Sequence, residues 1–199
     1  MIISRVTHFI QHKFRVNSSL TLLITLFMIW GCNQNKDFIK LDAPLEDILP
    51  KIILIAPKNN DDIEKNIEIT VGEEYSGEGE YPISEIELHK FTYELHNEYV
   101  AEGNRYIYVI VAYNWGGSGT FYYLTAVDKT TLKSVDEVFL DDRIKVNDLE
   151  LTTPWSDSVS LTYLVRSSNV PMAAPPDKKV NMKYRMSESK LIKDIESSK

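Results

Sequence analysis

The sequence predicts a mainly β fold, or an α+β fold with little helix, in which residues 51–199 form a single antiparallel β-rich domain of meander or sandwich type. Three observations support this prediction. Segments of strand length recur along the region, and each is either apolar throughout or alternates between apolar and polar residues. Short segments rich in turn residues separate them, which favours hairpins over crossover helices. No long segment shows the 3.6-residue period of an amphipathic helix.

Residues 1–31 are predicted to be a signal peptide. The first fifteen residues include Arg5, Lys13 and Arg15 and no acidic residue, and the uncharged stretch that follows is most apolar over residues 20–30. A basic region followed by a short apolar segment is typical of secretory signal peptides. A membrane-spanning helix needs about 20 apolar residues, which is longer than this segment. An uncleaved signal anchor is the alternative.

The single cysteine, Cys32, follows directly. Residues 29–32 (IWGC) resemble a bacterial lipobox, although Trp30 stands where that motif prefers a small residue. The resemblance implies that Cys32 is diacylated on its sulfur, becomes the new N-terminus and is acylated again on its amine. Two or more acyl chains give stable membrane anchoring. The alternative is an unpaired cysteine in a discarded leader. Because Asn33 and not aspartate comes next, the expected location is the cell envelope, and the outer membrane in a Gram-negative host.

Processing would make the chain strongly acidic. Removing residues 1–31 takes away three of the 22 Lys and Arg residues and none of the 29 Asp and Glu residues, which leaves a formal charge of −10. This charge argues against nucleic acid or an anionic bilayer surface as a partner, because both attract basic proteins. The acyl chains would therefore hold the protein to the membrane. With Cys32 lipidated, a disulfide is excluded.

Residues 32–50 are predicted to be the lipidated N-terminus and a tether. The segment is polar, has no sustained period and contains two prolines. Asp42 could cap a short helical turn over residues 43–49, with Pro44 near its start. We expect this segment to lie outside the core.

Six longer strands are predicted in the domain. The segment Arg105–Tyr113 is apolar on both faces, as in a central strand that is covered on both sides. Thr120–Val127 is similar and rich in aromatic residues, and the other four either alternate or are short apolar runs. The six predicted strands are Lys51–Ala56, Asn66–Gly72, Arg105–Tyr113, Thr120–Val127, Ser158–Val165 and Val180–Met186.

Shorter features complete the pattern. A final strand is expected over Lys190–Ile195 after a turn at Ser187–Ser189, with a short polar helix as the alternative. Tyr75–Pro82 is interpreted as a mobile polar loop, and Pro171–Pro176 as an ordered or extended connection, because prolines cannot occupy a central strand. Three short alternating pairs lie between the longer strands: Val138 with Leu140, Ile144 with Val146, and Leu149 with Leu151.

The segment NWGGSG, Asn114–Gly119, is the strongest local candidate for a binding site. Its glycines lie between two predicted strands, whereas a dinucleotide-binding loop leads into a helix, and no basic residue is close by. A hairpin loop that uses positive φ angles explains the glycines better. Loop aromatic residues such as Trp115 often contact ligands. The candidate binding residues are Tyr113, Asn114, Trp115, Gly117 and Ser118.

The sequence predicts neither a metal site nor a cofactor. His89 and His96 are seven residues apart on one strand and should point to opposite faces. Nucleophilic catalysis lacks a recognisable motif, because Ser118 has no strand-to-helix context. Four acidic residues flank the segment VFL at residues 138–140. Their spacing does not match a calcium-binding loop, and we expect them to lie in solvent at the ends of strands. They are Asp136, Glu137, Asp141 and Asp142.

Three segments resemble motifs of an uncharacterised exported bacterial family. Its members have a GGSGTFYYLA-like hairpin, a DRIK-like strand and a DPMCCP-like segment followed by a strand that ends in Tyr-Arg. The matching residues are Tyr113, Asn114, Gly116–Gly119 and Phe121–Leu124 in the first motif, Asp142–Lys145 in the second, and Pro171, Met172 and Pro175 in the third. Ala173 and Ala174 replace the paired cysteines, so any role of those thiols is absent here. The resemblance assigns no catalytic residue.

The leading hypothesis is a non-enzymatic envelope lipoprotein that binds an envelope protein or glycan through the Asn114–Gly119 hairpin. Two alternatives stay open. One is a periplasmic hydrolase whose site brings together Asp141, Asp142 and His89. The other is an inhibitor of lysozymes, which a cell-wall lysis assay would reveal.

Overall fold

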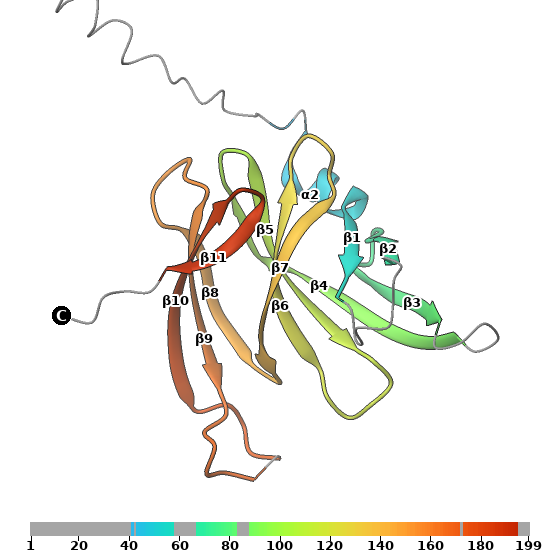
Figure 1. Ribbon diagram of the computed structural model, residues 1–199, viewed down its shortest axis with the longest axis vertical. Helices are drawn as coiled ribbons and strands as arrows, with labels where there is room; N and C mark the ends of the chain where they lie inside the picture. The colour runs from blue at the N-terminus through green and yellow to red at the C-terminus, as the bar shows by residue number, and fades with distance from the viewer. Residues whose placement is uncertain (1–40, 42, 58–66, 83–87, 172, 195–199) are drawn as a thin grey trace, which may run out of the picture. The chain divides into compact units, whose positions relative to one another are not determined.

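The computed structural model describes residues 41, 43–57, 67–82, 88–171 and 173–194, and the prediction of a mainly β fold is confirmed (Figure 1). The described part contains a short helix α2 (Leu45–Ile48), a 3₁₀ turn η1 (Leu49–Lys51) and antiparallel strands. The strands are β1 (Ile53–Ala56), β2 (Ile67–Thr70), β3 (Ser76–Pro82), β4 (Leu88–Glu102), β5 (Tyr106–Asn114), β6 (Phe121–Asp128), β7 (Ser134–Asp142), β8 (Lys145–Leu151), β9 (Ser158–Val165), β10 (Lys178–Ser187) and β11 (Lys190–Asp194).

Two meanders form the two larger sheets. The first sheet has the order β3-β4-β5-β6-β7, and the second has the order β11-β10-β9-β8. Strands β1 and β2 pair only with each other among the described strands. Every neighbouring pair is antiparallel, as expected when short connections join successive strands.

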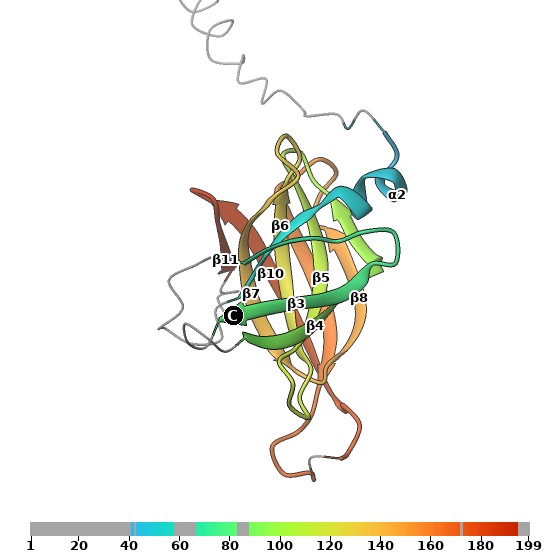
Figure 2. The same cartoon turned by 90° about the vertical axis from the view of Figure 1, so that its right-hand side faces the viewer.

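The first sheet is covered on both faces. One face packs against the second sheet, and we call the apolar layer between these two sheets the inner core. The other face packs against α2, η1, β1 and β2, and we call that layer the outer core. Figure 2 shows the N-terminal elements and the edge strand β3 in front of the other strands of the first sheet, with the second sheet behind them.

Strand β5 is shared by both cores. Its residues 106–113 are all buried, which confirms the prediction of a central strand covered on both sides. Because side chains alternate along a strand, odd-numbered positions from Ile107 to Tyr113 enter the outer core, and Tyr106, Tyr108 and Ile110 enter the inner core.

Side-chain hydrogen bonds link the edges of the two large sheets. On one edge, the hydroxyl of Tyr99 on β4 donates to the carbonyl oxygen of Val146 on β8 at 3.0 Å. On the other, the carboxylate of Asp136 on β7 accepts from the backbone N–H of Leu191 on β11 at 2.6 Å. The connection from β7 to β8 therefore crosses from one edge to the other, and Ile144 within it is buried in the inner core.

The expectation that residues up to Pro50 lie outside the core is wrong for the end of the tether. Ile48 and Leu49 are 6% and 4% exposed and belong to the outer core, because α2 and η1 lie over the first sheet. Helix α2 begins after Pro44 without a side-chain cap. Asp42, the predicted cap, lies outside the described residues.

The interpretation of Tyr75–Pro82 as a mobile loop is also wrong, because Ser76–Pro82 is the edge strand β3. Its glycines accommodate aromatic rings of β4. A Cβ atom on Gly77 would lie 2.7 Å from the Tyr93 hydroxyl, and one on Gly79 would collide with the Phe91 ring. These positions tolerate no side chain while the rings stay in place.

In the C-terminal half, the short alternating pairs around Ile144 and Leu149 belong to a single strand and the connection before it. Ile144 lies in the connection before β8, and Val146, Leu149 and Leu151 lie on β8 itself. A bulge between Val146 and Asp148 returns Leu149 to the inner core. The predicted final strand is confirmed as β11, and it follows a turn in which Glu188 and Ser189 have φ angles of 51° and 64°. Ile195 lies outside the described residues.

Candidate functional site

The predicted hairpin loop joins β5 to β6. Gly116 has a φ angle of 87°, which confirms the predicted use of a positive φ angle by a glycine. The Asn114 side-chain oxygen accepts a hydrogen bond from the Gly116 N–H at 3.0 Å and fixes the start of the loop. Gly117 and Ser118 are exposed at its tip, and a Cβ atom at Gly117 would meet open space.

The aromatic residues of the hairpin are not exposed ligand contacts. Tyr113 is fully buried, so its assignment as a candidate binding residue is wrong for direct contact. Trp115 is half-buried and packs on the outer core, with ring centroids 4.6 Å from Phe91 and 5.8 Å from Tyr113. The tryptophan therefore closes the outer core, which explains why an aromatic residue stands in a glycine-rich loop.

A groove of about 380 Å³ lies on the opposite face of β3, β4 and β5. Side chains that alternate with those of the outer core line it, and Asn114 of the predicted hairpin is among them. The residues that give the groove its chemistry are Glu78, Thr92, Glu94, Ala112, Asn114 and Thr120. Carboxylates, hydroxyls and an amide oxygen make this surface rich in hydrogen-bond acceptors.

The strand register explains how the groove arises. A single row of directly opposed residues crosses all five strands of the first sheet, and opposed residues share a face. Ala112 stands in the middle of the row between Glu94 and Tyr122, and its small side chain leaves the space between them open. The complete row is Ser76, Glu94, Ala112, Tyr122 and Asp141.

Of the two carboxylates that line the groove, only Glu78 has a cationic partner among the described residues. Glu78 lies 3.7 Å from the amine of Lys90, and both side chains are well exposed. Glu94 makes no ion pair with any described residue. Burial, together with the negative charge of Glu94, raises the pKa of Tyr122 above its ordinary value. The row therefore presents a neutral phenol beside an available carboxylate.

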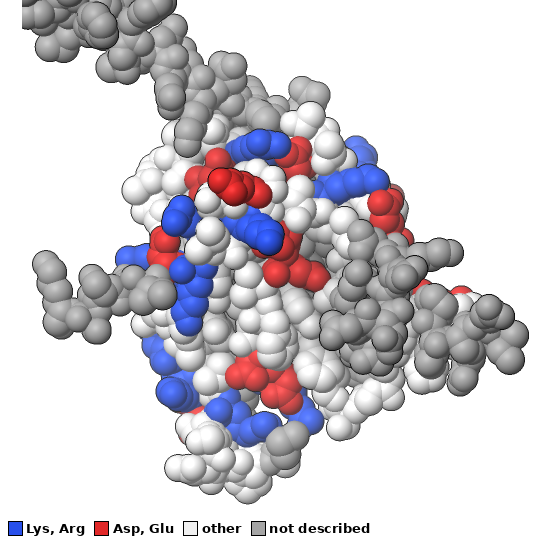
Figure 3. Space-filling model, in the orientation of Figure 1, with Lys and Arg blue, Asp and Glu red and all other residues white. Residues whose placement is uncertain are grey.

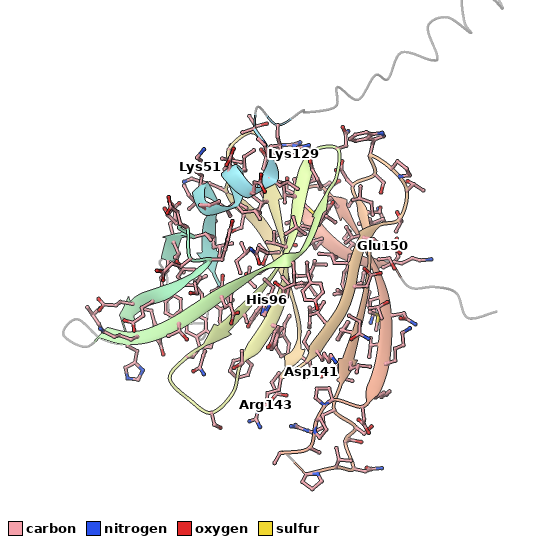
Figure 4. The ribbon with its side chains drawn as sticks, turned by 180° about the vertical axis from the view of Figure 1, so that it is seen from behind. Lys51, His96, Lys129, Asp141, Arg143 and Glu150 are labelled. Atoms are coloured by element: carbon pink, nitrogen blue, oxygen red, sulfur yellow. The ribbon has the colours of Figure 1, made fainter. Side chains whose placement is uncertain are left out.

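His96 lies next to this row on the same face of β4. Its ring stacks on Tyr122 with centroids 5.6 Å apart, and its Nδ1 lies 3.3 Å from a carboxylate oxygen of Glu98. The Nε2 atom is buried and has no hydrogen-bond partner within the described chain. In Figure 4, Asp141 and Arg143 are labelled below His96, toward the end where the β5–β6 hairpin lies.

The two histidines occupy opposite faces of β4, as predicted from their spacing. His89 contacts Tyr81, an outer-core residue, with ring centroids 5.7 Å apart, whereas His96 stacks on Tyr122. Asp141 shares the row of Tyr122, so the sheet separates it from His89. The structure therefore does not form the hydrolase site suggested for Asp141, Asp142 and His89.

The acidic residues that flank VFL have different environments. Asp142 lies between two arginines, 3.6 Å from Arg143 and 3.9 Å from Arg166. Glu137 is half-buried and its Oε2 atom is fully buried, so the expectation of a solvated strand end is wrong there. Among the residues described, no group of three or more His, Cys, Asp or Glu side chains could hold a metal ion.

As far as they are described, the three segments that resemble the exported family lie toward the same end of the two large sheets (Figures 1 and 2). The Arg143 N–H donates to the carbonyl oxygen of Thr120 at 2.9 Å, which joins the DRIK-like segment to the hairpin. Arg166, at the start of the β9–β10 connection, approaches Asp142. The Asp177 carboxylate accepts two hydrogen bonds from Ser167 and holds the base of that connection.

Sequence reasoning found Asn114 but missed the acidic part of the groove. Glu78 lies in the segment that the sequence predicts to be a loop, and Glu94 belongs to no recognisable motif. The alternation of residues 91–96, FTYELH, was a usable signal, since it places Thr92, Glu94 and His96 opposite an apolar face. The register that aligns Glu94 with Tyr122 depends on three strands and is not visible in any local segment.

Cys32, the predicted lipidation site, lies outside the described residues. Within the described part of the chain, no helix is both long enough and apolar enough to cross a membrane. Comparison with known proteins finds no matching family model, no matching curated protein and no matching solved structure.

Proposed function

We propose that this chain is a non-enzymatic lipoprotein of the bacterial envelope, anchored through acyl chains on Cys32, which binds a donor-rich envelope partner in the groove of the first sheet. The anchor is supported by the basic and apolar segments of residues 1–31 and by the lipobox-like residues 29–32. The groove supplies the binding surface.

The groove beside the cross-strand row is the observation on which the binding role depends. Glu94, Asn114 and Thr120 supply a carboxylate, an amide and a hydroxyl around the small side chain of Ala112. Such a surface fits amines, amides and hydroxyls, which both proteins and glycans present. The neighbouring hairpin extends the surface with the exposed Gly117 and Ser118.

The anchor is tested by mass spectrometry of the protein purified from membranes. The expected result is a chain that begins at Cys32 and carries acyl chains, and Cys32→Ser should leave the leader uncleaved. An intact leader or an unmodified thiol in the wild-type protein would contradict the anchor.

The binding role is tested separately by capture of envelope proteins and soluble cell-wall fragments on purified protein. The combined variant Glu94→Gln/Asn114→Ala should lose the captured partner. Glu150→Gln, which changes an exposed carboxylate on β8, is the matched control and should retain it. Equal capture by both variants would exclude the groove.

A further inference from the structure

The β10–β11 hairpin has a charge opposite to that of the rest of the chain. Between residues 178 and 194 there are six Lys and Arg residues and two acidic residues, in a chain whose portion after residue 31 carries a formal charge of −10. In Figure 3, basic side chains follow β10 down the left side of the molecule. The basic residues are Lys178, Lys179, Lys183, Arg185, Lys190 and Lys193.

The strand register places several of these side chains on one surface. Even-numbered residues of β10 from Val180 to Met186 face the inner core, so Lys179 and Arg185 project from the outward face. Across the ladder, Ile192 opposes Arg185, and Lys190 opposes Ser187. We call the surface formed by Lys179, Lys183, Arg185, Lys190 and Ile192 the basic face.

Intramolecular pairing neutralises only part of the basic face. Arg185 forms an ion pair with Asp194 at 2.9 Å. Lys179 and Lys190 are exposed and form no ion pair with any residue that the structure describes. Their positive charge is therefore available to a partner. Ile192 is 41% exposed among these cations, which gives the face an apolar contact as well.

The length of the chain before the core limits how far this face can move from a membrane. If Cys32 carries the proposed acyl chains, eight residues lie between it and Leu41, the first described residue, so their Cα atoms are nine residue steps apart. An extended chain of this length spans at most about 32 Å. A tether this short keeps the domain at high effective concentration beside the bilayer, so a weak contact suffices to orient it.

Although the net charge of the whole chain argues against an anionic bilayer as a partner, we propose that the basic face of β10–β11, whose local charge is positive, docks on the surface of a bilayer that contains anionic phospholipids. Lysines near such a surface are attracted to its negative potential. A lipid anchor combined with a basic surface is a common two-signal arrangement for stable and oriented attachment. The acidic remainder of the domain would then face away from the membrane. This inference adds to the proposed anchor, but the docking contact itself needs no acyl chain.

The test uses residues 32–199 with Cys32→Ser, a chain that retains every described residue of both cores and carries no lipid. Co-sedimentation with vesicles of phosphatidylcholine and phosphatidylglycerol is compared with vesicles of phosphatidylcholine alone. We expect binding to the anionic vesicles only, and loss of that binding in 0.5 M salt, which is about the level that screens surface charges.

Two double variants with the same change of net charge locate the contact. Lys179→Gln/Lys190→Gln should weaken binding about 30-fold, on the basis of the attraction expected for two lysines. The control Lys51→Gln/Lys90→Gln removes two exposed lysines from η1 and β4 and should bind like the parent chain.

Three outcomes would overturn the proposal. They are absence of binding to anionic vesicles at low salt, equal weakening in the two double variants, and binding to a short DNA duplex as strong as binding to the vesicles. None of them bears on acylation of Cys32, which mass spectrometry tests independently. Failure of the basic face and failure of the anchor are therefore distinguishable.

Discussion

The carboxylate of Asp136 on β7 accepts a hydrogen bond from the backbone N–H of Leu191 on β11 at 2.6 Å. This contact joins the edge strands of the two large sheets without a main-chain ladder between them. Hydrogen bonds to charged acceptors are among the stronger ones in proteins. At the opposite edge, Tyr99 makes the corresponding link to Val146. Both links can be tested by substitution.

Asp136→Ala should lower the free energy of unfolding by about 1–3 kcal/mol, because the Leu191 N–H loses its acceptor at a partly buried site. Urea denaturation monitored by tryptophan fluorescence measures the change. Asp148→Ala is the control, since Asp148 is exposed on β8. Equal effects of the two substitutions would argue against a specific role for the link.

Tyr99→Phe should lower the free energy of unfolding by about 1 kcal/mol, the usual contribution of one hydrogen bond. Tyr106→Phe is the control, because no hydrogen bond is observed from its hydroxyl within the described chain. The double variant Tyr99→Phe/Asp136→Ala should show additive losses, since the two links lie at opposite edges. A strongly non-additive result would mean that the edges are coupled.

Glu137→Gln should stabilise the protein at neutral and alkaline pH. Burial, together with the negative charge of Asp136, raises the pKa of Glu137 to about 8. Its buried Oε2 has no hydrogen-bond partner in the described part. Between the unfolded pKa, about 4.5, and about pH 8, the folded state holds a proton that the unfolded state has released. The free energy of unfolding therefore falls as pH rises through this range.

Glutamine at position 137 cannot ionise, so this variant should lose that part of the pH dependence. At pH 8 it should be more stable than the wild type by on the order of 2 kcal/mol, and at pH 4 the two should nearly coincide. Urea midpoints across pH 4–9 provide the measurement, with Glu150→Gln as the exposed control. Parallel pH profiles for wild type and Glu137→Gln would contradict the explanation.

Lys129→Met should be strongly destabilising. The Lys129 amine is fully buried, lies 2.7 Å from a carboxylate oxygen of Glu102 and donates to the carbonyl of Gly103 at 3.2 Å. Removing one partner of a buried pair leaves the other charge poorly compensated, at a cost of about 2–4 kcal/mol. Lys133→Met is the control, because its ion pair with Glu68 is exposed and should contribute less than about 1 kcal/mol. Thermal unfolding distinguishes the two variants.

Gly79→Ala should destabilise the edge strand β3, because the new methyl group would occupy the position of the Phe91 ring. Phe91 is 1% exposed and packs against Trp115 and Tyr113, so it has little room to move. The expected cost is about 1–3 kcal/mol, in line with other overpacked sites. Gly117→Ala meets open space and should be nearly neutral. A neutral result at Gly79 would show that the ring can shift.

The strands that sequence analysis predicted share a local signal. Arg105–Tyr113 and Ser158–Val165 have apolar patterns that identify a strand and its buried faces without knowledge of any neighbour. The final strand was recognisable from Leu191 and the preceding turn. These features depend on side-chain period and turn chemistry, which are properties of short segments.

The errors have non-local causes. The glycines of Ser76–Pro82 disfavour a strand, so the sequence predicts a loop there. In the structure this segment is a strand, because rings from β4 fill the space that side chains at the glycines would occupy. Trp115 is expected from its place in a loop to contact ligands, although the ring turns back onto Phe91. The groove depends on the alignment of Glu94, Ala112 and Tyr122 across three strands. Register of this kind is set by the whole sheet.

Strand β5 has a consequence for how the molecule melts. Its side chains alternate between two apolar layers, so neither layer can lose its packing without exposing the backbone that supports the other. We therefore expect heat to disrupt both layers in one cooperative, two-state transition, with equal calorimetric and van't Hoff enthalpies. Tyr108 and Val109, adjacent in the chain and packed in different layers, should then show the same slow amide exchange, limited by global unfolding.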